Sequence, residues 1–202
     1  MTSNTDKKVA LVTGATSPIG SAIAKRLHSD DYRLVLAVNS SSKQGAELAE
    51  QLDAVVIAAD LSDPEGPESL VGDALERAGG IDALVNNAAC QKLEDWSTID
   101  SGKWDEMLDV NLRAAQLLMN VVSGHMVSEQ KAGAIVNISS IEAYQPSASH
   151  SHYAISKAGL LMATKAAASE LGQHGIRVNS VSPGLIDDGN LHDRWPEGVE
   201  RW

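Results

Sequence analysis

The chain has 202 residues, 43% of them hydrophobic, which is enough apolar side chain for one sizeable core, so we expect a single domain over residues 1–202. The formal net charge is −11, and lysine and arginine are scattered, which disfavours nucleic acid and anionic membranes as partners because both require a basic face. The longest apolar runs are too short to cross a bilayer, and a single cysteine excludes an internal disulfide framework.

The first residues of the chain carry no targeting pattern. Residues 1–8 are polar and contain no apolar run before a small-residue cleavage site. We therefore expect no signal peptide, a flexible start over residues 1–7 and a cytoplasmic protein. The lone thiol, Cys90, is expected to be buried and inert.

Short β-branched apolar runs alternate with longer helical patterns along the chain. The expected strands are residues 9–12, 34–38, 54–58, 83–85, 134–138 and 177–181. The expected helices are residues 21–28, 43–52, 67–78, 103–122 and 153–171. Because neighbouring parallel strands need a crossover connection, this alternation predicts a Rossmann-like α/β fold in three αβα layers. Right-handed crossovers give a doubly wound parallel sheet of six strands in the order 3-2-1-4-5-6.

A glycine-bearing segment, Thr13 to Gly20, follows the first expected strand and leads into a helix. Such a turn aims backbone N–H groups and the positive end of a helix at a phosphate. A tight turn without a ligand explains the glycines equally well, but the place after the first strand of a doubly wound sheet favours nucleotide binding. Pro18 stands where a glycine is usual and lacks an N–H donor, although proline is tolerated in a first helical turn. The hydroxyls of Thr16 and Ser17 are candidate replacements for that contact.

Tyr153 and Lys157 are four residues apart, which places a phenol and an ammonium on one face of a helix. A nearby cation lowers a phenol pKa from about 10 and makes the group usable in proton transfer. Ser140 follows an expected strand at a carboxyl end and can donate a hydrogen bond to a substrate oxygen. Taken alone, the Tyr153–Lys157 pair is also consistent with exposed residues on a helix surface. Ser140 alone is also consistent with a serine that caps a turn after a strand.

In this order, the motifs resemble those of the short-chain dehydrogenase/reductase superfamily from the first strand to about Ile186. Thr13-Gly14 through Gly20 resembles its cofactor loop, and Asn86-Asn87-Ala88-Ala89 resembles its fourth-strand signature. Ser182-Pro183-Gly184 resembles its turn after the sixth strand, and four residues fall where its catalytic tetrad falls: Asn111, Ser140, Tyr153 and Lys157.

The resemblance implies an NAD(P)-dependent oxidoreductase that moves a hydride between a nicotinamide cofactor and a small carbonyl or alcohol substrate. Tyr153 is then the proton donor or acceptor, Ser140 orients the substrate oxygen, and Lys157 lowers the tyrosine pKa and holds the ribose hydroxyls. Asn111, through an irregularity in its helix backbone, is implied to hold a water that relays protons to Lys157.

The same resemblance implies the positions that contact the cofactor. They are Gly14, Thr16, Ser17, Ile19, Gly20, Asn39, Ser40, Asp60, Leu61, Asn87, Ala88, Tyr153, Lys157, Pro183, Gly184 and Ile186. An acidic residue near position 39 normally holds the 2′-hydroxyl of NAD and repels a 2′-phosphate. Here the position is Asn39, followed by three serines and Lys43, which favours NADP(H) and leaves NAD(H) as the alternative.

The substrate loop is the part that the sequence constrains least. His150 and His152 suggest a polar loop rather than a metal site, since two histidines without further ligands rarely bind a metal. Glu142 and Tyr144 are candidate substrate contacts, and solvated loop residues explain them as well.

The end of the sequence departs from the family pattern. Residues 187–202 resemble an incomplete substrate-loop region, and the seventh strand usual in the family is expected to be missing. The alternative function is therefore a truncated or degenerate member that binds nucleotide or a partner chain without turnover. The resemblance also implies a homo-oligomer through the helices at residues 103–122 and 153–171.

Overall fold

Strands and helices alternate along the chain as the hydrophobic pattern predicts. The computed structural model describes residues 7–40, 42–187, 189, 191–194, 196 and 199. The strands are β1 (Val9–Thr13), β2 (Arg33–Val38), β3 (Val55–Ala58), β4 (Ala83–Asn86), β5 (Gly133–Ile138) and β6 (Ile176–Val181). The helices are α1 (Pro18–Ser29), α2 (Lys43–Gln51), α3 (Gly66–Ala78), α4 (Ser101–Leu108), α5 (Ala114–Ser128), α6 (Ser151–Leu171) and α7 (Leu191–Arg194). The expected flexible start at residues 1–7 lies outside the described residues except for Lys7.

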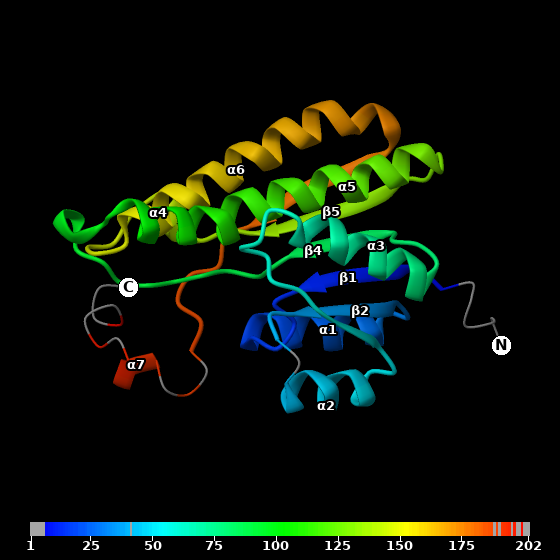
Figure 1. Ribbon diagram of the computed structural model, residues 1–202, viewed down its shortest axis with the longest axis horizontal. Helices are drawn as coiled ribbons and strands as arrows, with labels where there is room; N and C mark the ends of the chain where they lie inside the picture. The colour runs from blue at the N-terminus through cyan, green and yellow to red at the C-terminus, as the bar shows by residue number, and fades with distance from the viewer. Residues whose placement is uncertain are drawn as a thin grey trace.

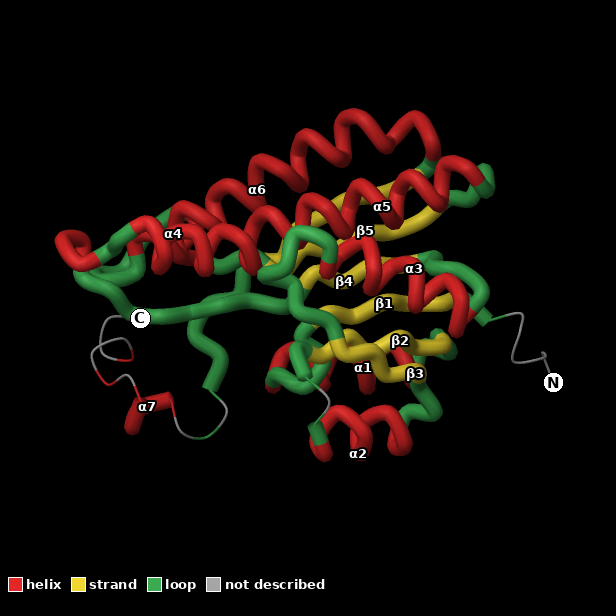
Figure 2. Tube along the Cα trace, viewed as in Figure 1, coloured by secondary structure: helices red, strands yellow, loops and turns green. Residues whose placement is uncertain are grey.

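The six strands form one parallel sheet in the order β3-β2-β1-β4-β5-β6, which confirms the predicted topology. β1 lies at the centre, where Ala10 pairs with Leu34 of β2 and with Ala83 of β4. All five residues of β1 are buried, because helices cover both faces of the sheet around it. Figure 2 shows the strands stacked between the helical layers.

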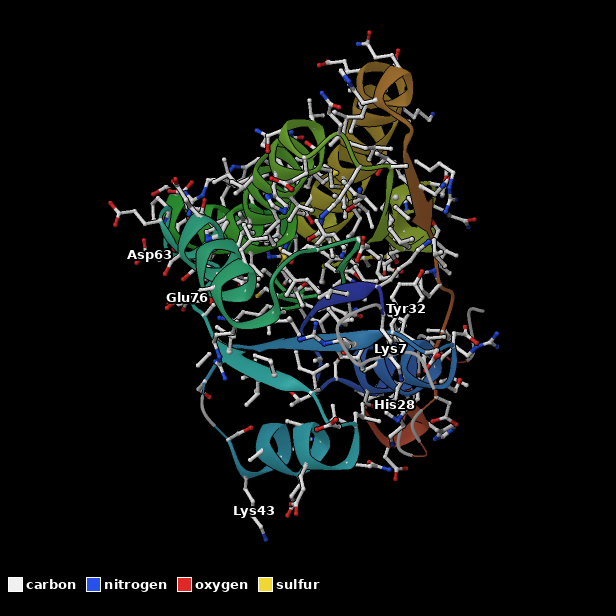
Figure 3. All side chains as sticks on the ribbon, turned by 90° about the vertical axis from the view of Figure 1, so that its right-hand side faces the viewer. Lys7, His28, Tyr32, Lys43, Asp63 and Glu76 are labelled. Atoms are coloured by element: carbon white, nitrogen blue, oxygen red, sulfur yellow. The ribbon has the colours of Figure 1, made fainter. Side chains whose placement is uncertain are left out.

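Alternate residues of the central strands supply two separate hydrophobic cores. Val9 and Leu11 belong to the core beneath α3, α5 and α6, whereas Ala10 and Val12 belong to the core beneath α1 and α2. Figure 1 shows α3, α5 and α6 together on one side of the sheet, with α1 and α2 on the other. The side view in Figure 3 places Glu76 of α3 and His28 of α1 on opposite sides of the sheet. The structure is thus a three-layer αβα sandwich, as predicted.

The two faces are covered unequally at β6. Ile176 and Val178 are buried against the α5–α6 side, whereas Arg177, Asn179 and Val181 on the opposite face are exposed. Among the described residues, α1 and α2 cover only the part of this face that lies over the β1–β3 half of the sheet. No helix within the described ranges is both long and apolar enough to span a membrane.

Two predicted helix boundaries are wrong, and each for a local reason. α1 begins at Pro18 rather than at residue 21, because proline occupies the first helical position, where an N–H has no helical partner. The helix expected over residues 103–122 extends from Ser101 to Ser128, but one π-helical turn at Asp109–Arg113 divides it into α4 and α5. This turn widens the backbone at Asn111.

Candidate active site

A cavity of about 1040 Å³ lies along the carboxyl ends of the strands. Segments that follow each of the six strands contribute to its wall: residues 14–19 after β1, 37–39 at β2, 59–62 after β3, 87–91 after β4, 138–142 at β5 and 183–186 after β6. Open α/β sheets bind ligands at this edge, because loops from several strands converge there. The volume is at the upper end of the range for ligand sites in proteins.

The loop between β1 and α1 is preformed by local hydrogen bonds. The Ser17 hydroxyl caps α1 by accepting a hydrogen bond from the Gly20 N–H at 3.0 Å, and the Ser17 N–H donates to the Gly14 carbonyl at 3.1 Å. Gly14 has φ +60°, a left-handed conformation that favours glycine. Pro18, which replaces the usual glycine, fits this arrangement as the first residue of α1.

Gly20 fits into a space that excludes any side chain. A Cβ atom there would lie 2.3 Å from the Gly14 carbonyl oxygen and 2.8 Å from the amide nitrogen of Asn87. Gly20 does not line the cavity, so its part is to let α1 approach the loop closely.

Asn87 holds the same loop from the neighbouring strand. Its side-chain amide donates to the carbonyls of Thr13 and Gly14, both at 2.9 Å, and to the Ser17 hydroxyl at 3.2 Å. The Thr13 hydroxyl in turn accepts hydrogen bonds from the N–H groups of Asn87 and Ala88, both at 3.0 Å. Thr13 was not among the predicted site residues, although a threonine at the end of a buried strand, next to a glycine, is recognisable in the sequence as a residue that can hold the loop.

The segment after β2 does not bring its lysine to the cavity wall. Asn39 lines the cavity, but Ser40 does not, and Ser41 lies outside the described residues. The Ser42 hydroxyl caps α2 by accepting from the Gly45 N–H at 3.1 Å. Lys43 is exposed, pairs with Glu47 at 3.4 Å and projects from α2 into solvent (Figure 3). The expectation that Lys43 helps to accommodate a phosphate is therefore not supported by its position.

Lys157 is a buried cation on the cavity wall. It is 2% exposed, and its ammonium donates to the Ile138 carbonyl at 2.9 Å. Burial lowers the pKa of Lys157 from 10.5 to about 8, because the charged form loses hydration. Its Nζ lies 5.7 Å from the centre of the Tyr153 ring.

Tyr153 and Ser140 lie on the same wall, and the pKa of Tyr153 moves against expectation. Burial raises the pKa of the Tyr153 phenol, and the Glu142 charge raises it further, while a hydrogen bond with Ser140 opposes both. The expected lowering by Lys157 is not found in this structure: burial is the main influence on the pKa of the phenol, and the Lys157 ammonium is bonded to the Ile138 carbonyl.

Asn111 lies in the π-helical turn, as its expected backbone irregularity requires, but not on the cavity wall. Its side chain bridges three segments: Oδ1 accepts from the Cys90 N–H at 2.7 Å, and Nδ2 lies 2.9 Å from the Cys90 carbonyl and 3.1 Å from the Ser156 hydroxyl. These bonds fix the loop after β4 against α6. Its side-chain hydrogen bonds are made to Cys90, Met107 and Ser156 rather than to Lys157.

The loop before α6 is more buried than the sequence suggests. Glu142 is 5% exposed and His150 is 3% exposed, and the two side chains pair in the cavity wall, with His150 Nδ1 2.9 Å from Glu142 Oε1. Glu142 is thus not a solvated loop residue, whereas Tyr144 is exposed. His152 is also buried, in the first turn of α6. His150 is therefore a buried polar residue of the loop, whereas His152 lies in α6 and not in the loop.

Cys90 is only partly buried and lines the cavity, which corrects the expectation of a fully buried thiol. Burial and the Glu106 charge raise its pKa, so the thiol form is favoured. Over the described ranges, no three histidine, cysteine or carboxylate side chains come together as a metal site.

Most of the predicted site residues meet in this one cavity. The predicted residues that line the cavity are Gly14, Thr16, Ser17, Ile19, Asn39, Asp60, Leu61, Asn87, Ala88, Ser140, Tyr153, Lys157, Pro183, Gly184 and Ile186. Gly20, Ser40 and Asn111 do not line it. Glu142, a candidate substrate contact, also lines it, and so do His150 and Cys90, which the sequence did not assign to the site.

Comparison with known proteins gives consistent matches over nearly the whole chain. Residues 8–198 match a family model described as short chain dehydrogenase. The chain is 39% identical over 188 residues to dehydrogenase/reductase SDR family member 4 of Bos taurus, covering 90% of this chain. The chain spans 66% of the length of that relative, slightly under two thirds.

Two solved structures share the fold closely. A putative short-chain alcohol dehydrogenase from Sinorhizobium meliloti superposes with a TM-score of 0.86 at 31% identity, over 94% of this chain and 80% of that one. A metagenomic short-chain oxidoreductase in complex with NADP superposes with a TM-score of 0.82 at 34% identity, over 89% of this chain and 83% of that one.

Proposed function

The chain belongs to the short-chain dehydrogenase/reductase family, and we propose that it is an NADPH-dependent oxidoreductase that reduces a small carbonyl substrate to an alcohol. The observation that carries the proposal is one continuous cavity. The glycine loop after β1 forms one part of its wall, and Ser140, Tyr153 and Lys157 form another. If a nicotinamide dinucleotide binds along the strand ends, its nicotinamide ring would thus lie near the proposed proton donor, Tyr153.

The residues present fit a nicotinamide dinucleotide. The wall next to α1 consists of Gly14, Thr16, Ser17, Pro18 and Ile19, with no carboxylate, and α1 begins there, which suits a pyrophosphate. Asp60 and Leu61 would face the adenine, Asn87 and Ala88 the adjoining ribose, and Pro183, Gly184 and Ile186 the nicotinamide. When bound, the cofactor supplies the hydride, and the protein supplies position and electrostatics.

Tyr153 is the proposed acid. Because burial raises its pKa, the phenol holds its proton throughout the physiological pH range. A protonated phenol can donate to the oxygen of a carbonyl as that oxygen gains negative charge. Alcohol oxidation would instead require the phenolate as proton acceptor.

Ser140 and Lys157 assist Tyr153 in different ways. Ser140 is proposed to donate a hydrogen bond to the substrate oxygen, so that both hydroxyls converge on the developing charge. The Lys157 ammonium, held by the Ile138 carbonyl, is proposed to bind the ribose hydroxyls and to replenish the phenol proton. The π-helical turn at Asn111 is proposed to hold a water that supplies protons to Lys157.

The preference for NADPH rests on the end of β2. Asn39 lines the cavity where a carboxylate would repel a 2′-phosphate, so no charge there opposes NADPH. A relative of known structure, 34% identical, binds NADP. NAD(H) remains the alternative cofactor, since Lys43 points away from the cavity.

We also propose a homo-oligomer through the α4–α5 segment and α6. Trp104 on α4 and Ile155 and Met162 on α6 are exposed large hydrophobic side chains. Met162→Glu is expected to lower the molar mass measured by light scattering, and an unchanged mass would exclude this face as the interface.

Thermal melting of the purified chain, alone and with each nicotinamide cofactor, tests the proposal first. A ligand that binds only the native state raises apparent stability, by about 2.7 kcal/mol at a hundred times its Kd. We expect a larger upward shift with NADPH than with NADH, and NADPH oxidation when carbonyl compounds are added. A melt that neither cofactor moves would favour the alternative of a member without turnover.

A further inference from the structure

The pair formed by Glu142 and His150 lies beside the proposed proton donor and has no part in the reaction derived above. The Glu142 N–H donates to the Ser140 hydroxyl at 3.1 Å. The His150 ring lies 5.6 Å from the Tyr153 ring, tilted by 49°. A substrate whose carbonyl meets Ser140 and Tyr153 would therefore place its next atoms near this pair.

The carboxylate of Glu142 retains capacity for another donor. His150 Nδ1 lies 2.9 and 3.1 Å from its two oxygens, and the Ser147 N–H donates to Oε2 at 3.3 Å. Two carboxylate oxygens offer about four acceptor positions, so these partners leave at least one on Oε1. A hydroxyl group of a ligand in the cavity can fill that position.

The surroundings make the pair selective. The cavity wall also includes the apolar side chains of Ile141, Leu185 and Ile186. Glu142 itself is only 5% exposed, and a largely desolvated carboxylate binds a hydroxyl more strongly than it would in water. A ligand that brings an alkyl group instead would cover the acceptor without satisfying it, and sites of this kind reject such analogues strongly.

We propose that Glu142, held by His150, is a specificity-determining residue that binds a substrate hydroxyl close to the reacting carbonyl, so that the substrate class is hydroxyketones and related polyhydroxy carbonyl compounds. This inference rests on the proposed reductase function. It adds the chemical class of the substrate, which the catalytic residues leave open.

A matched pair of ketones tests the inference. 1-Hydroxybutan-2-one and pentan-3-one differ only by a hydroxyl in place of a methyl group. With NADPH, we expect kcat/KM to be about 10- to 100-fold higher for the hydroxyketone, the range for a hydrogen bond to a charged group. Equal values for the two ketones would overturn the inference but leave the reductase function standing. Reduction of neither, with no cofactor-induced melting shift, would reject both.

Two variants separate recognition from a purely structural part in the loop. Glu142→Leu removes the acceptor and is expected to lower kcat/KM for the hydroxyketone about 10- to 100-fold more than kcat/KM for pentan-3-one. Glu142→Gln keeps one acceptor oxygen of the same shape and is expected to retain part of the preference. The melting temperature of each variant reports whether the loop still folds. An equal fall for both ketones, in either variant, would mean that the pair only holds the loop and would overturn the inference.

Discussion

The two halves of the cavity are built on different physical principles. Around the β1–α1 loop, neutral hydrogen bonds and the absence of side chains set the shape: Asn87 binds the loop, and Gly20 leaves room for it. Around β5 and α6, buried ionisable groups set the properties, namely Lys157, Tyr153 and the Glu142–His150 pair. The loop half gains stability from its contacts, whereas burial of charge in the β5–α6 half costs stability. Two regions with opposite effects on stability thus meet in one cavity.

The largest expected effect comes from Tyr153→Phe in the β5–α6 half. Removing the phenolic oxygen should lower kcat for carbonyl reduction by about 100- to 10,000-fold, because the proton donor is lost. Cofactor binding, followed by the melting shift with NADPH, should change little. Tyr144→Phe is the matched control, since Tyr144 is exposed and does not line the cavity. Retained turnover in Tyr153→Phe would remove this residue from its proposed place in the reaction.

In the half of the cavity around the β1–α1 loop, adding a side chain at Gly20 should destabilise the protein by steric overlap. Gly20→Ala places a Cβ 2.3 Å from the Gly14 carbonyl oxygen, and we expect a loss of about 3 kcal/mol in unfolding free energy together with weaker cofactor binding. Gly72→Ala is the control, because a Cβ at this exposed position of α3 meets nothing within 4 Å. That change should stabilise the protein by about 0.5–1 kcal/mol. Denaturant unfolding measures both, and a harmless Gly20→Ala would refute the packing argument.

Lys157→Met tests the stability cost of buried charge in the β5–α6 half, since it is expected to abolish activity and yet stabilise the fold. A pKa of about 8 in place of 10.5 corresponds to about 3 kcal/mol of destabilisation at neutral pH, at about 1.4 kcal/mol per pKa unit. The lost hydrogen bond to the Ile138 carbonyl offsets about 1–2 kcal/mol of this. We therefore expect a net gain of about 1–2 kcal/mol at pH 7 by denaturant unfolding.

The pH dependence of the same group has a definite sign. Between about pH 8 and 10.5 the unfolded chain binds the Lys157 proton more tightly than the folded chain does, so this residue makes the unfolding free energy rise with pH in that window. The stability difference between Lys157→Met and the parent protein should therefore shrink as the pH increases. A difference that stays constant from pH 7 to pH 10 would contradict the burial cost assigned to the ammonium.

The smallest expected effect concerns cofactor choice in the loop half. Asn39→Asp places a carboxylate on the cavity wall, where its repulsion of a 2′-phosphate amounts to about 1–4 kcal/mol, so KM for NADPH should rise about tenfold or more. KM for NADH should fall or stay the same. Ser40→Asp is the control, because Ser40 does not line the cavity. Equal responses of the two variants would locate the 2′-position elsewhere.

The fold class and most of the residues that line the cavity could be predicted from the sequence alone. Alternating apolar runs predicted the strands, since parallel strands buried on both faces leave a strong pattern of hydrophobic residues, and right-handed crossovers predicted their order. The Tyr153–Lys157 spacing and the glycines after β1 were equally legible, because a helical repeat and a positive φ act through residues close in sequence.

The electrostatics of the cavity wall, by contrast, depend on tertiary packing. The pKa of Tyr153 rises instead of falling, and Glu142 and His150 form a buried pair rather than a solvated loop, because burial depends on which segments pack together. The position of Lys43 on the solvent side of α2 is of the same kind. Charge in a protein takes its energy from its surroundings, and those surroundings come from residues far away in the sequence.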